Sequence, residues 1–277
     1  MNGYLNMNIT LLMTTRNRLA PVRRLFESLR VQTCQTFTLL LGDQNPQGYL
    51  NALLEEYQNV FPIRHIFLSP QGLSRARNAL LPYADGDIIA LTDDDCYYAP
   101  ESLEHVVDFF ANIPDACALT GNPNDLLPEY AQWGENRFSI FRNAPSWVIF
   151  LRATAVRSTG FFDDSLGIGS DGPYQSGEET DYLLRIWKGN IGSIQRRGNV
   201  RIFHDMISIT DTNAIMKAYG YALGRMKLLR KHEFPLWFKL SNILYPLACL
   251  AQEGLIAWPY RRAMFWGRLK GIFQRGI

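Results

Sequence analysis

Three consecutive aspartates, Asp93, Asp94 and Asp95, follow the apolar run from Ile88 to Leu91. The run is continuous, β-branched at its start and preceded by a glycine turn, which predicts a buried strand. Adjacent carboxylates raise one another's pKa unless a cation or a solvated loop relieves the repulsion. In an extended segment Asp93 and Asp95 would share one side and Asp94 would point away. The pattern predicts a site for Mg²⁺ or Mn²⁺, which take further ligands from substrate phosphates; the alternative is a solvated acidic turn.

Other polar residues follow the predicted strands that precede this one. Thr15 and Arg16 come after a strand expected at 7–14, and Asp43 closes a strand expected at 38–42. In an open α/β sheet, ligands bind in the crevice outside the carboxyl ends of the strands. We therefore expect these side chains to share one crevice with the aspartates. Asp43 could accept hydrogen bonds from a base or ribose, or it could be a turn residue.

A helix is predicted from Ser74 to Tyr83, with Ser74 in the N-cap position and Arg75 and Arg77 in the first turn. Basic residues at a helix N-terminus oppose the helix dipole, so they favour an anionic partner such as a diphosphate. The alternative is local pairing of these arginines with Asp85 or Asp87.

A second acidic group follows a glycine-rich segment, residues 167–177. Ser176 would cap a helix whose first turn holds Glu178, Glu179 and Asp181. A cap and first-turn acids are good helix-start chemistry, which is one interpretation. The glycines predict a mobile segment, either a loop that orders over a bound ligand or a floppy connection.

Strands and helices alternate through the first ninety residues, which is typical of a parallel sheet with right-handed crossovers. We predict an α/β fold with a nucleotide-binding, Rossmann-like first half. The expected strands are 7–14, 38–42, 63–68, 88–91, 118–121, 146–151 and a last edge strand at 199–203, with helices at 22–32, 49–58, 74–83 and 152–159 and an irregular loop at 122–142.

The composition fits a globular chain: 277 residues, 47% hydrophobic and 19% charged. The four cysteines form no CxxC pair, so neither a zinc site nor a disulfide framework is indicated, and a reducing compartment fits best. The first ten residues lack a basic segment and a long apolar core, so no secretory signal is expected. We expect a cytoplasmic protein.

The charge is uneven along the chain. Residues 212–277 hold 11 Lys or Arg and 2 acids, whereas residues 1–211 hold 17 basic and 24 acidic residues. We place a domain boundary there, with a helix capped by Asp211 or Thr212 and ending near Lys231. The following apolar segment, interrupted by charges and broken by Pro246, is too short to span a membrane. Its aromatic and basic residues predict an in-plane helix on an anionic leaflet; the alternative is a helical cap packed on the domain or on a second subunit.

The ordered series of motifs resembles the inverting family-two glycosyltransferases of the GT-A fold. The series comprises TTRNR, the Asp after the second strand, GLSRARN, DGDIIALTDDDC, GFFDDSLGIGS and SGEETDYLLR. It covers residues 8 to 205. The resemblance implies a GT-A domain at 1–211 with a C-terminal helical appendage at 212–277. It also implies a nucleotide-sugar donor, a divalent metal and a sugar acceptor.

The resemblance also implies roles for single residues. It puts Asp43 at the base, Arg77 near the nucleotide, Asp93 at the ribose or metal and Asp95 on the metal, with His204 as a further metal or phosphate ligand. The general base would be Glu179, where the family more often has Asp, with Asp181 and Glu178 as lesser candidates. Together with the polar residues expected in the crevice, the residues expected to contact the nucleotide-sugar donor are Thr15, Arg16, Asp43, Arg75, Arg77, Asp93 and Asp94.

These expectations combine into a metal-dependent inverting glycosyltransferase of surface polysaccharide synthesis. It would use a UDP-sugar, Mn²⁺ or Mg²⁺, and a saccharide or lipid-linked saccharide acceptor at the inner face of the cytoplasmic membrane. A nucleotidyltransferase would need a glycine-rich phosphate loop, which TTRNRLAP lacks. A non-catalytic nucleotide-sugar-binding module at the membrane would tolerate loss of Glu179. A nucleic-acid partner is not expected, because the tail's basic residues sit beside long aliphatic runs; a homo-oligomer is the other use of the tail.

Overall fold

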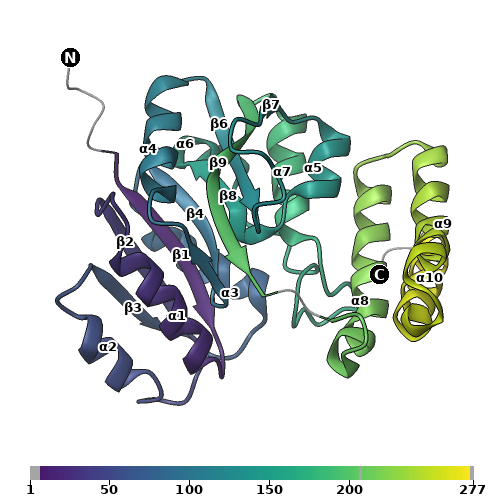
Figure 1. Cartoon of the computed structure of the whole chain (residues 1–277), viewed down its shortest axis with the longest axis horizontal. Helices are drawn as coiled ribbons and strands as arrows, with labels where there is room; N and C mark the ends of the chain where they lie inside the picture. Colours follow the sequence, from purple (N-terminus) through teal and green to yellow (C-terminus); the bar gives the residue numbers. More distant parts are fainter. Residues whose placement is uncertain (1–6, 206–207, 275–277) are drawn as a thin grey trace. The chain divides into compact units, whose positions relative to one another are not determined.

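The computed structural model describes residues 7–205 and 208–274. The described chain forms two compact units (Figure 1). The first unit comprises residues 7–71, 75–162 and 182–205, and the second comprises 72–74, 163–181 and 208–274. Helices α3 (Leu73–Leu80) and α7 (Glu178–Lys188) contribute residues to both units.

The first unit is built on a nine-stranded mixed sheet in the order β3-β2-β1-β4-β8-β6-β9-β5, with β7 paired to β9. Strands β3, β2, β1 and β4 are parallel, as the alternating pattern predicted. Strand β8 is antiparallel to both β4 and β6, which makes the sheet mixed. The strands are β1 Ile9–Thr15, β2 Phe37–Asp43, β3 Ile63–Phe67, β4 Ile88–Asp93, β5 Cys96–Tyr98, β6 Ala116–Pro123, β7 Gln132–Gly134, β8 Ile149–Arg152 and β9 Ser193–His204.

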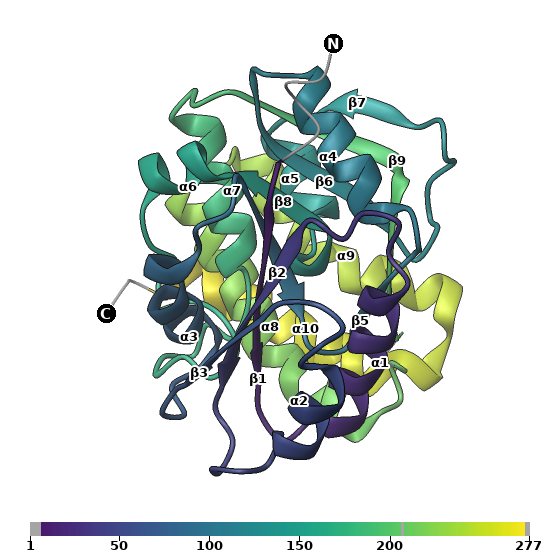
Figure 2. The same ribbon diagram turned by 90° about the vertical axis from the view of Figure 1, so that its left-hand side faces the viewer.

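Helices cover both faces of this sheet because alternate strand residues point to opposite sides. Leu11 packs in the cluster shared with α1 (Leu19–Arg30), α2 (Asn51–Tyr57) and α4 (Ser102–Asn112). Its neighbour Leu12 packs in the cluster shared with α3 and α6 (Ala153–Thr159). Figure 2 shows the two helix layers on either side of β1. Parallel sheets are normally covered by helices on both faces, and their strands are therefore continuously apolar.

The second unit contains helices α8 (Thr212–Lys231), α9 (Leu236–Glu253) and α10 (Trp258–Phe273), with a 3₁₀ turn η3 (Leu255–Ala257) between the last two. The Asp211 side chain accepts hydrogen bonds from the backbone of Asn213 and Ala214, so the predicted cap is confirmed. Helix α10 approaches α8 closely, because a Cβ on Gly267 would lie 2.7 Å from that of Ala222. Within the described residues, no helix is both long and apolar enough to cross a membrane.

Several predicted elements differ from the structure. Residues 146–151 begin as a 3₁₀ turn, η2 (Ser146–Val148), before β8. The expected irregular loop at 122–142 contains β7 and most of helix α5 (Arg137–Asn143), whose capping box joins Asn136 and Ser139. The expected edge strand at 199–203 belongs to β9, which lies inside the sheet between β6 and β5. The five residues 199–203 form only the end of β9, and their apolar pattern does not indicate that β9 pairs with a neighbouring strand on each side.

Neither predicted serine cap is correct. Helix α3 begins one residue earlier, at Leu73, and the Ser74 hydroxyl donates to the Leu166 carbonyl at 2.6 Å. The Ser176 hydroxyl donates to the Tyr221 carbonyl at 3.0 Å, and α7 begins at Glu178. Each hydroxyl thus donates to a carbonyl of another segment.

Pro246 does not break the apolar tail segment but lies inside α9. A proline has no backbone N–H, so the carbonyl four residues earlier loses its helical partner. That carbonyl belongs to Asn242, and it accepts a hydrogen bond from the buried Arg268 guanidinium of α10. Burial lowers the pKa of Arg268 to about 10, so the arginine stays charged at neutral pH. The Arg268 side chain of α10 therefore replaces the backbone N–H donor that Pro246 lacks in α9.

Candidate functional site

The parallel strands bring the predicted crevice residues of the first unit to one edge of the sheet. Strand β1 pairs with β2 and β4 so that Thr15 is opposite Asp43 and Thr14 is opposite Asp93. The carboxyl ends of parallel strands are the usual place for ligands in such sheets. Arg16 is exposed just beyond this edge, in the loop after β1, and Arg75 is half-buried in the first turn of α3.

Asp93, the last residue of β4, is held by two donors. Arg77 Nη2 lies 2.8 Å from its Oδ1, and the Ser146 hydroxyl donates to its Oδ2 at 2.7 Å. The Arg77 side chain is 1% exposed, while that of Asp93 is 24% exposed. The guanidinium also stands 5.8 Å above the ring of Phe162. Arg77 is thus a buried cation at the edge where the sequence predicted a diphosphate.

Asp94 and Asp95 lie in the turn between β4 and β5, so the alternation expected for an extended segment does not hold. Arg18 contacts both of them, at 3.1 Å from Asp94 Oδ1 and in a short ion pair with Asp95 Oδ2. The Thr15 hydroxyl donates to Asp94 Oδ2 at 2.7 Å. Burial raises the pKa of Asp94 to about 6, although Arg18 and Thr15 each favour the ionised form.

Asp95 faces His204. The His204 Nε2 atom lies 3.0 Å from Asp95 Oδ1, and both side chains are 21% exposed. Pairing of β5 with β9 sets this contact, because Cys96 is opposite His204 in the register. Burial alone would raise the pKa of Asp95, but His204 and Arg18 hold that pKa below its usual value. The hydrogen bond to Asp95 raises the pKa of His204 against the effect of burial.

The donor set at Asp95 and His204 suits a divalent ion that is also bound by phosphate. Among the described residues, no three His, Cys, Asp or Glu side chains are grouped to hold a metal by themselves. Mg²⁺ and Mn²⁺ in phosphate sites need only one or two protein ligands, and an imidazole nitrogen suits Mn²⁺. Asp95 Oδ1 and His204 Nε2 are hydrogen-bonded to each other at 3.0 Å, so both would bind one ion if that ion replaced the hydrogen bond. Arg18, whose side chain is 43% exposed, is the cation that pairs with Asp95 at this corner.

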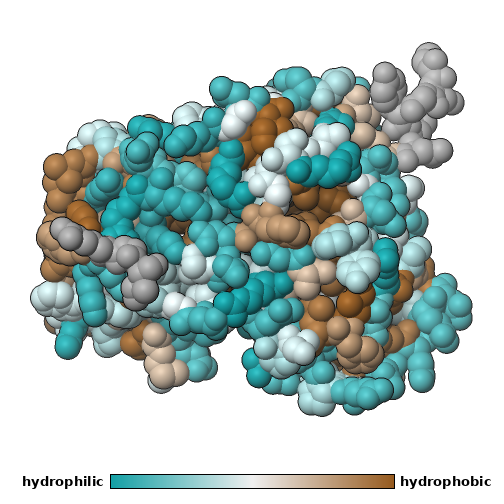
Figure 3. Space-filling view, turned by 180° about the vertical axis from the view of Figure 1, so that it is seen from behind, coloured by the Kyte–Doolittle hydropathy of each residue, from teal (hydrophilic) through white to brown (hydrophobic). Residues whose placement is uncertain are grey.

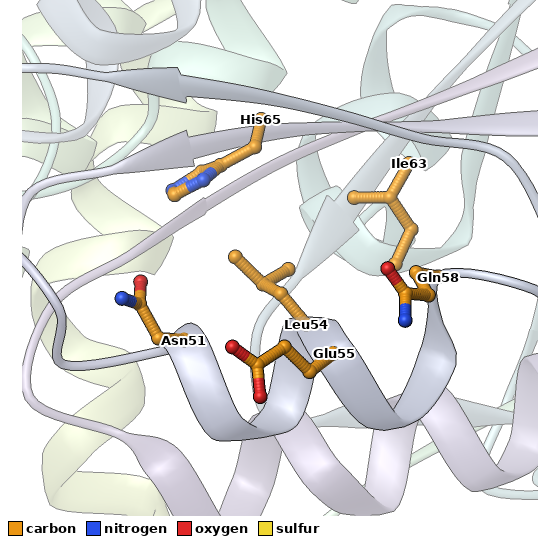
Figure 4. Close-up of a pocket in the computed structure, with 6 residues that line it drawn as sticks. All are labelled: Asn51, Leu54, Glu55, Gln58, Ile63 and His65. Carbon is orange, nitrogen blue, oxygen red and sulfur yellow. The ribbon is translucent and has the colours of Figure 1, made fainter.

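Asp43 is almost fully buried, with 1% exposure. Its Oδ2 lies 2.9 Å from His65 Nε2, and its Oδ1 accepts from the backbone and side chain of Asn45 at 2.9 and 2.7 Å. His65 also lines an open pocket of about 360 Å³ between β3 and α2. Figure 4 shows the His65 ring on the strand above Asn51 and Leu54 of the helix. None of the predicted site residues lines this pocket, which meets Asp43 only through His65.

The second unit holds the acidic first turn of α7. Asp181 is fully buried, and its Oδ1 lies 2.7 Å from Lys231 Nζ and 2.8 Å from His232 Nε2. Lys231 also contacts Asp163 Oδ2 at 2.7 Å. Burial would raise the pKa of Asp163, but hydrogen bonds from Lys231 and Ser165 hold it at about 2. Asp181 therefore joins the first turn of α7 to the end of α8 through an ion pair whose carboxylate is buried.

The other two acids of this turn have different surroundings. Glu178 is 4% exposed, and a Cβ on Gly167 would lie 3.0 Å from its Oε2. Glu179 is half-buried, and the Thr180 hydroxyl donates to its Oε1 at 3.3 Å. Of the three predicted base candidates, Glu179 is the one least enclosed by protein.

The glycine-rich loop before α7 is attached to the start of α3 within the same unit. The backbone N–H of Leu73 donates to the Ile168 carbonyl at 2.9 Å. Gly72 and Gly169 both have positive φ, and a Cβ on Gly72 would lie 2.4 Å from the Gly169 carbonyl oxygen. The two backbones touch at a place where neither residue can carry a side chain.

Sequence reasoning missed four residues of these groups: Arg18, Ser146, His65 and Lys231. Arg18 belongs to the TTRNR motif, so its position after β1 was a usable signal. His65 shares the inward alternation of β3 with Ile63. Ser146 and Lys231 lie about fifty residues from their aspartate partners, Asp93 and Asp181, and no local pattern connects them.

Comparisons with known proteins indicate a glycosyltransferase family. Residues 10–162, more than half of the chain, match the family described as Glycosyl transferase family 2. A glucosyl-dolichyl phosphate glucuronosyltransferase of Haloferax volcanii is 22% identical over 198 residues, covering 65% of this chain and 63% of that protein. The chain spans less than two thirds of the length of the curated relatives it matches.

Solved structures give the same result for the fold. The mannosyltransferase PcManGT of Pyrobaculum calidifontis, in complex with GDP-Man and Mn²⁺, superposes with a TM-score of 0.69 at 13% identity, covering 96% of this chain and 86% of that one. S. aureus TarS 1-349 in complex with UDP-GlcNAc gives a TM-score of 0.61 at 14% identity, covering 97% and 93%. The predicted GT-A fold, a mixed α/β sheet flanked by helices with C-terminal helices appended, is confirmed.

Proposed function

The chain belongs to glycosyl transferase family 2, and we propose that it is a metal-dependent inverting glycosyltransferase that uses a nucleotide-diphosphate sugar. The observation that carries this proposal is the Asp95–His204 pair at 3.0 Å, beside strand ends that also present Asp93 and the buried Arg77. An acid–imidazole pair next to a buried guanidinium is suited to a metal-bound diphosphate.

For the donor we propose a UDP-sugar. Asp43 would accept a hydrogen bond from the base once His65 had turned away, because its carboxylate is 1% exposed and already contacts His65 and Asn45. Arg77 would pair with the diphosphate, where its buried position makes the interaction strong. Thr15, Arg16, Arg75, Asp93 and Asp94 are the other proposed donor contacts. The UDP-GlcNAc complex of TarS supports uridine as the base, whereas the GDP-Man complex of PcManGT keeps guanosine as an alternative.

Asp95 and His204 are the proposed metal ligands, with Asp93 as a third candidate. The Asp93 carboxylate would first have to turn from Arg77 and Ser146. When bound, Mn²⁺ or Mg²⁺ would neutralise charge on the diphosphate leaving group. Support for Mn²⁺ comes from the imidazole in the donor set and from the PcManGT complex.

Glu179 is the proposed general base, with Glu178 as the next candidate. Its carboxylate would accept the proton of an acceptor hydroxyl while that oxygen forms a bond to the anomeric carbon. The bond from the anomeric carbon to the diphosphate oxygen breaks in the same step, and the nucleoside diphosphate leaves. A single in-line displacement of this kind inverts the anomeric configuration. Asp181 is better suited to positioning, because it is fully buried and Lys231 and His232 already contact its carboxylate.

A saccharide is the proposed acceptor, and a lipid-linked saccharide is the finer proposal. The Haloferax relative, named for a dolichyl phosphate substrate, supports a lipid carrier. A lipid-linked acceptor would place the chain at the inner face of the cytoplasmic membrane, as in surface polysaccharide synthesis.

Calorimetric titration with UDP tests the donor and metal assignments together. We expect binding in Mn²⁺ that falls at least tenfold in EDTA and in Asp95→Ala. A matched control is Asp85→Ala, because the Asp85 side chain is 74% exposed and its one ion pair among the described residues is a long contact of 3.8 Å to Arg64. Equal affinity with and without metal, in wild type and in Asp95→Ala, would contradict the metal assignment. Binding of GDP in preference to UDP would contradict the uridine assignment alone.

A further inference from the structure

The outward side of α9 is mostly apolar from Leu236 to Leu247. Its inward side buries Phe238, Ile243 and Pro246, so the helix has a packed face and an open face. The exposed fractions on the open face range from 39% to 65%, for Leu236, Trp237, Leu240, Leu244, Tyr245 and Leu247. Single exposed apolar residues are ordinary on protein surfaces, but a continuous helix face of them marks a contact site.

Exposed apolar residues continue along the chain through η3 and into α10. Leu255 and Ile256, in the turn between the helices, are 86% and 70% exposed. Along α10 the exposed residues recur every three or four positions and alternate aromatic with basic side chains: Trp258, Arg262, Trp266, Lys270 and Phe273. Figure 3 shows hydrophobic side chains gathered over the C-terminal helices, at the left-hand end of that view. We refer to this surface, from Leu236 to Phe273, as the α9–α10 face.

The charges of this face are of one sign. Glu253 is the only acid in the sequence from 236 to 274, and its carboxylate pairs with Arg261. Arg268 is buried against the Asn242 carbonyl. The exposed charges that remain on α10 are those of Arg262 and Lys270, so the face needs a partner that is apolar and anionic.

A second copy of the chain does not meet that need. A two-fold interface places the same patch against itself, so its basic residues would require acids within the patch. A lipid leaflet with anionic headgroups provides both an apolar interior and negative charge, and tryptophan favours the boundary between them. Since no described helix can cross a membrane, the contact would lie in the membrane plane.

We propose that the α9–α10 face docks on an anionic lipid surface, with Leu255 and Ile256 entering the acyl boundary and Arg262 and Lys270 contacting headgroups. This inference extends the membrane location in the proposed function, but it rests on the second unit alone and needs no catalytic activity. Docking would hold the chain at the surface where a lipid-linked acceptor is presented.

Vesicle sedimentation of the full chain tests the proposal, with phosphatidylcholine vesicles compared with vesicles containing one quarter phosphatidylglycerol. We expect binding to the anionic vesicles, weaker binding at raised salt and little binding to the neutral ones. The double variant Leu255→Ser, Ile256→Ser should lower the partition coefficient at least tenfold. Arg262→Gln and Lys270→Gln should each lower it about fivefold on anionic vesicles.

The matched control is Leu126→Ser with Tyr130→Ser, because these residues of the first unit are 73% and 87% exposed. The control should bind vesicles like wild type, and all variants should keep the wild-type melting temperature and UDP affinity. Equal pelleting of wild type and the Leu255/Ile256 variant would overturn the proposal. So would a dimer in sedimentation velocity that this variant dissociates while vesicles bind neither protein. Loss of UDP binding with vesicle binding retained would instead contradict the proposed function.

Discussion

The molecule has two clusters of acids that read alike in the sequence and differ in the structure. At the end of β4, Asp93 and Asp95 are 24% and 21% exposed. In the first turn of α7, Asp181 has no exposed surface and is enclosed by Lys231 and His232. Both clusters have cationic partners, so pairing alone does not separate them. What separates them is whether solvent, and therefore a ligand, can reach the carboxylate.

This difference assigns separate roles to the accessible and the enclosed carboxylates. A partly exposed carboxylate can exchange an arginine such as Arg18 for a metal or substrate group. A fully buried one cannot lose its partner without leaving a charge unpaired, which is strongly destabilising. We therefore expect substitutions at Asp181 to change stability, and substitutions at Glu179 in the same turn to change catalysis.

The largest expected effect is that of Glu179→Gln. Transfer should fall at least a hundredfold because the amide cannot accept the hydroxyl proton, while UDP affinity stays within twofold of wild type. Initial rates of nucleotide release with saccharide acceptor, together with calorimetry, measure the two quantities. Unchanged turnover would move the base to another residue, and Glu178→Gln would then be the next variant to measure.

A smaller effect, on stability, is expected for Asp181→Asn. Removing this charge leaves His232 and Lys231 with a neutral partner and should cost about 2 kcal/mol of unfolding free energy, below the fully buried range because Lys231 is partly exposed. Urea denaturation measures the change. Asp85→Asn, at an exposed site, is the control and should stay within about 0.5 kcal/mol of wild type. A loss of catalysis with no loss of stability in Asp181→Asn would erase the distinction between the clusters.

The smallest effect concerns pH and the Asp163–Lys231 pair. The pKa of Asp163 is about 2 in the folded chain and near 3.8 in the unfolded one, so the unfolded state binds protons first as pH falls. The pair's stabilisation is therefore complete above about pH 5 and is lost progressively below pH 4. Because the carboxylate is partly exposed, we expect the advantage of wild type over Asp163→Asn to shrink by at most about 1 kcal/mol between pH 5 and pH 3. A constant difference in denaturation free energy over that range would show that Lys231 does not hold Asp163 ionised.

The first half of the fold was predictable because its signals are local. Strands and short helices alternate from β1 to β4, and the apolar runs of β1, β2 and β4 end in the polar residues that the register brings to the sheet edge. The antiparallel insertion of β8 and the interior position of β9 were not predictable. Both depend on pairing between strands that are far apart in sequence. The four residues of β8 do not indicate which strands will lie beside it.

The candidate site was predictable in residue types more than in contacts. Asp95 and His204 were both predicted as metal ligands, and the structure places them 3.0 Å apart. The prediction that Asp94 points away from Asp95 was wrong, because the two residues lie in a turn where Arg18 contacts both carboxylates. Likewise, Asp181 pairs with Lys231 at the end of α8, and the SGEETD motif carries no sign of a partner so far along the chain. The catalytic assignment of Glu179 and the metal set stay predictions.

The meeting of Gly72 and Gly169 has a consequence for how this sequence can evolve. A methyl group at position 72 would come within 2.4 Å of the carbonyl oxygen at position 169, and one at position 169 would lie 2.9 Å from the Cα of residue 72. A clash between two main chains has no compensating side-chain change, unlike a clash in a core. Homologues that keep this loop shape should therefore retain both glycines even where the flanking residues drift. Homologues that lose either glycine should have a loop of different length between α6 and α7.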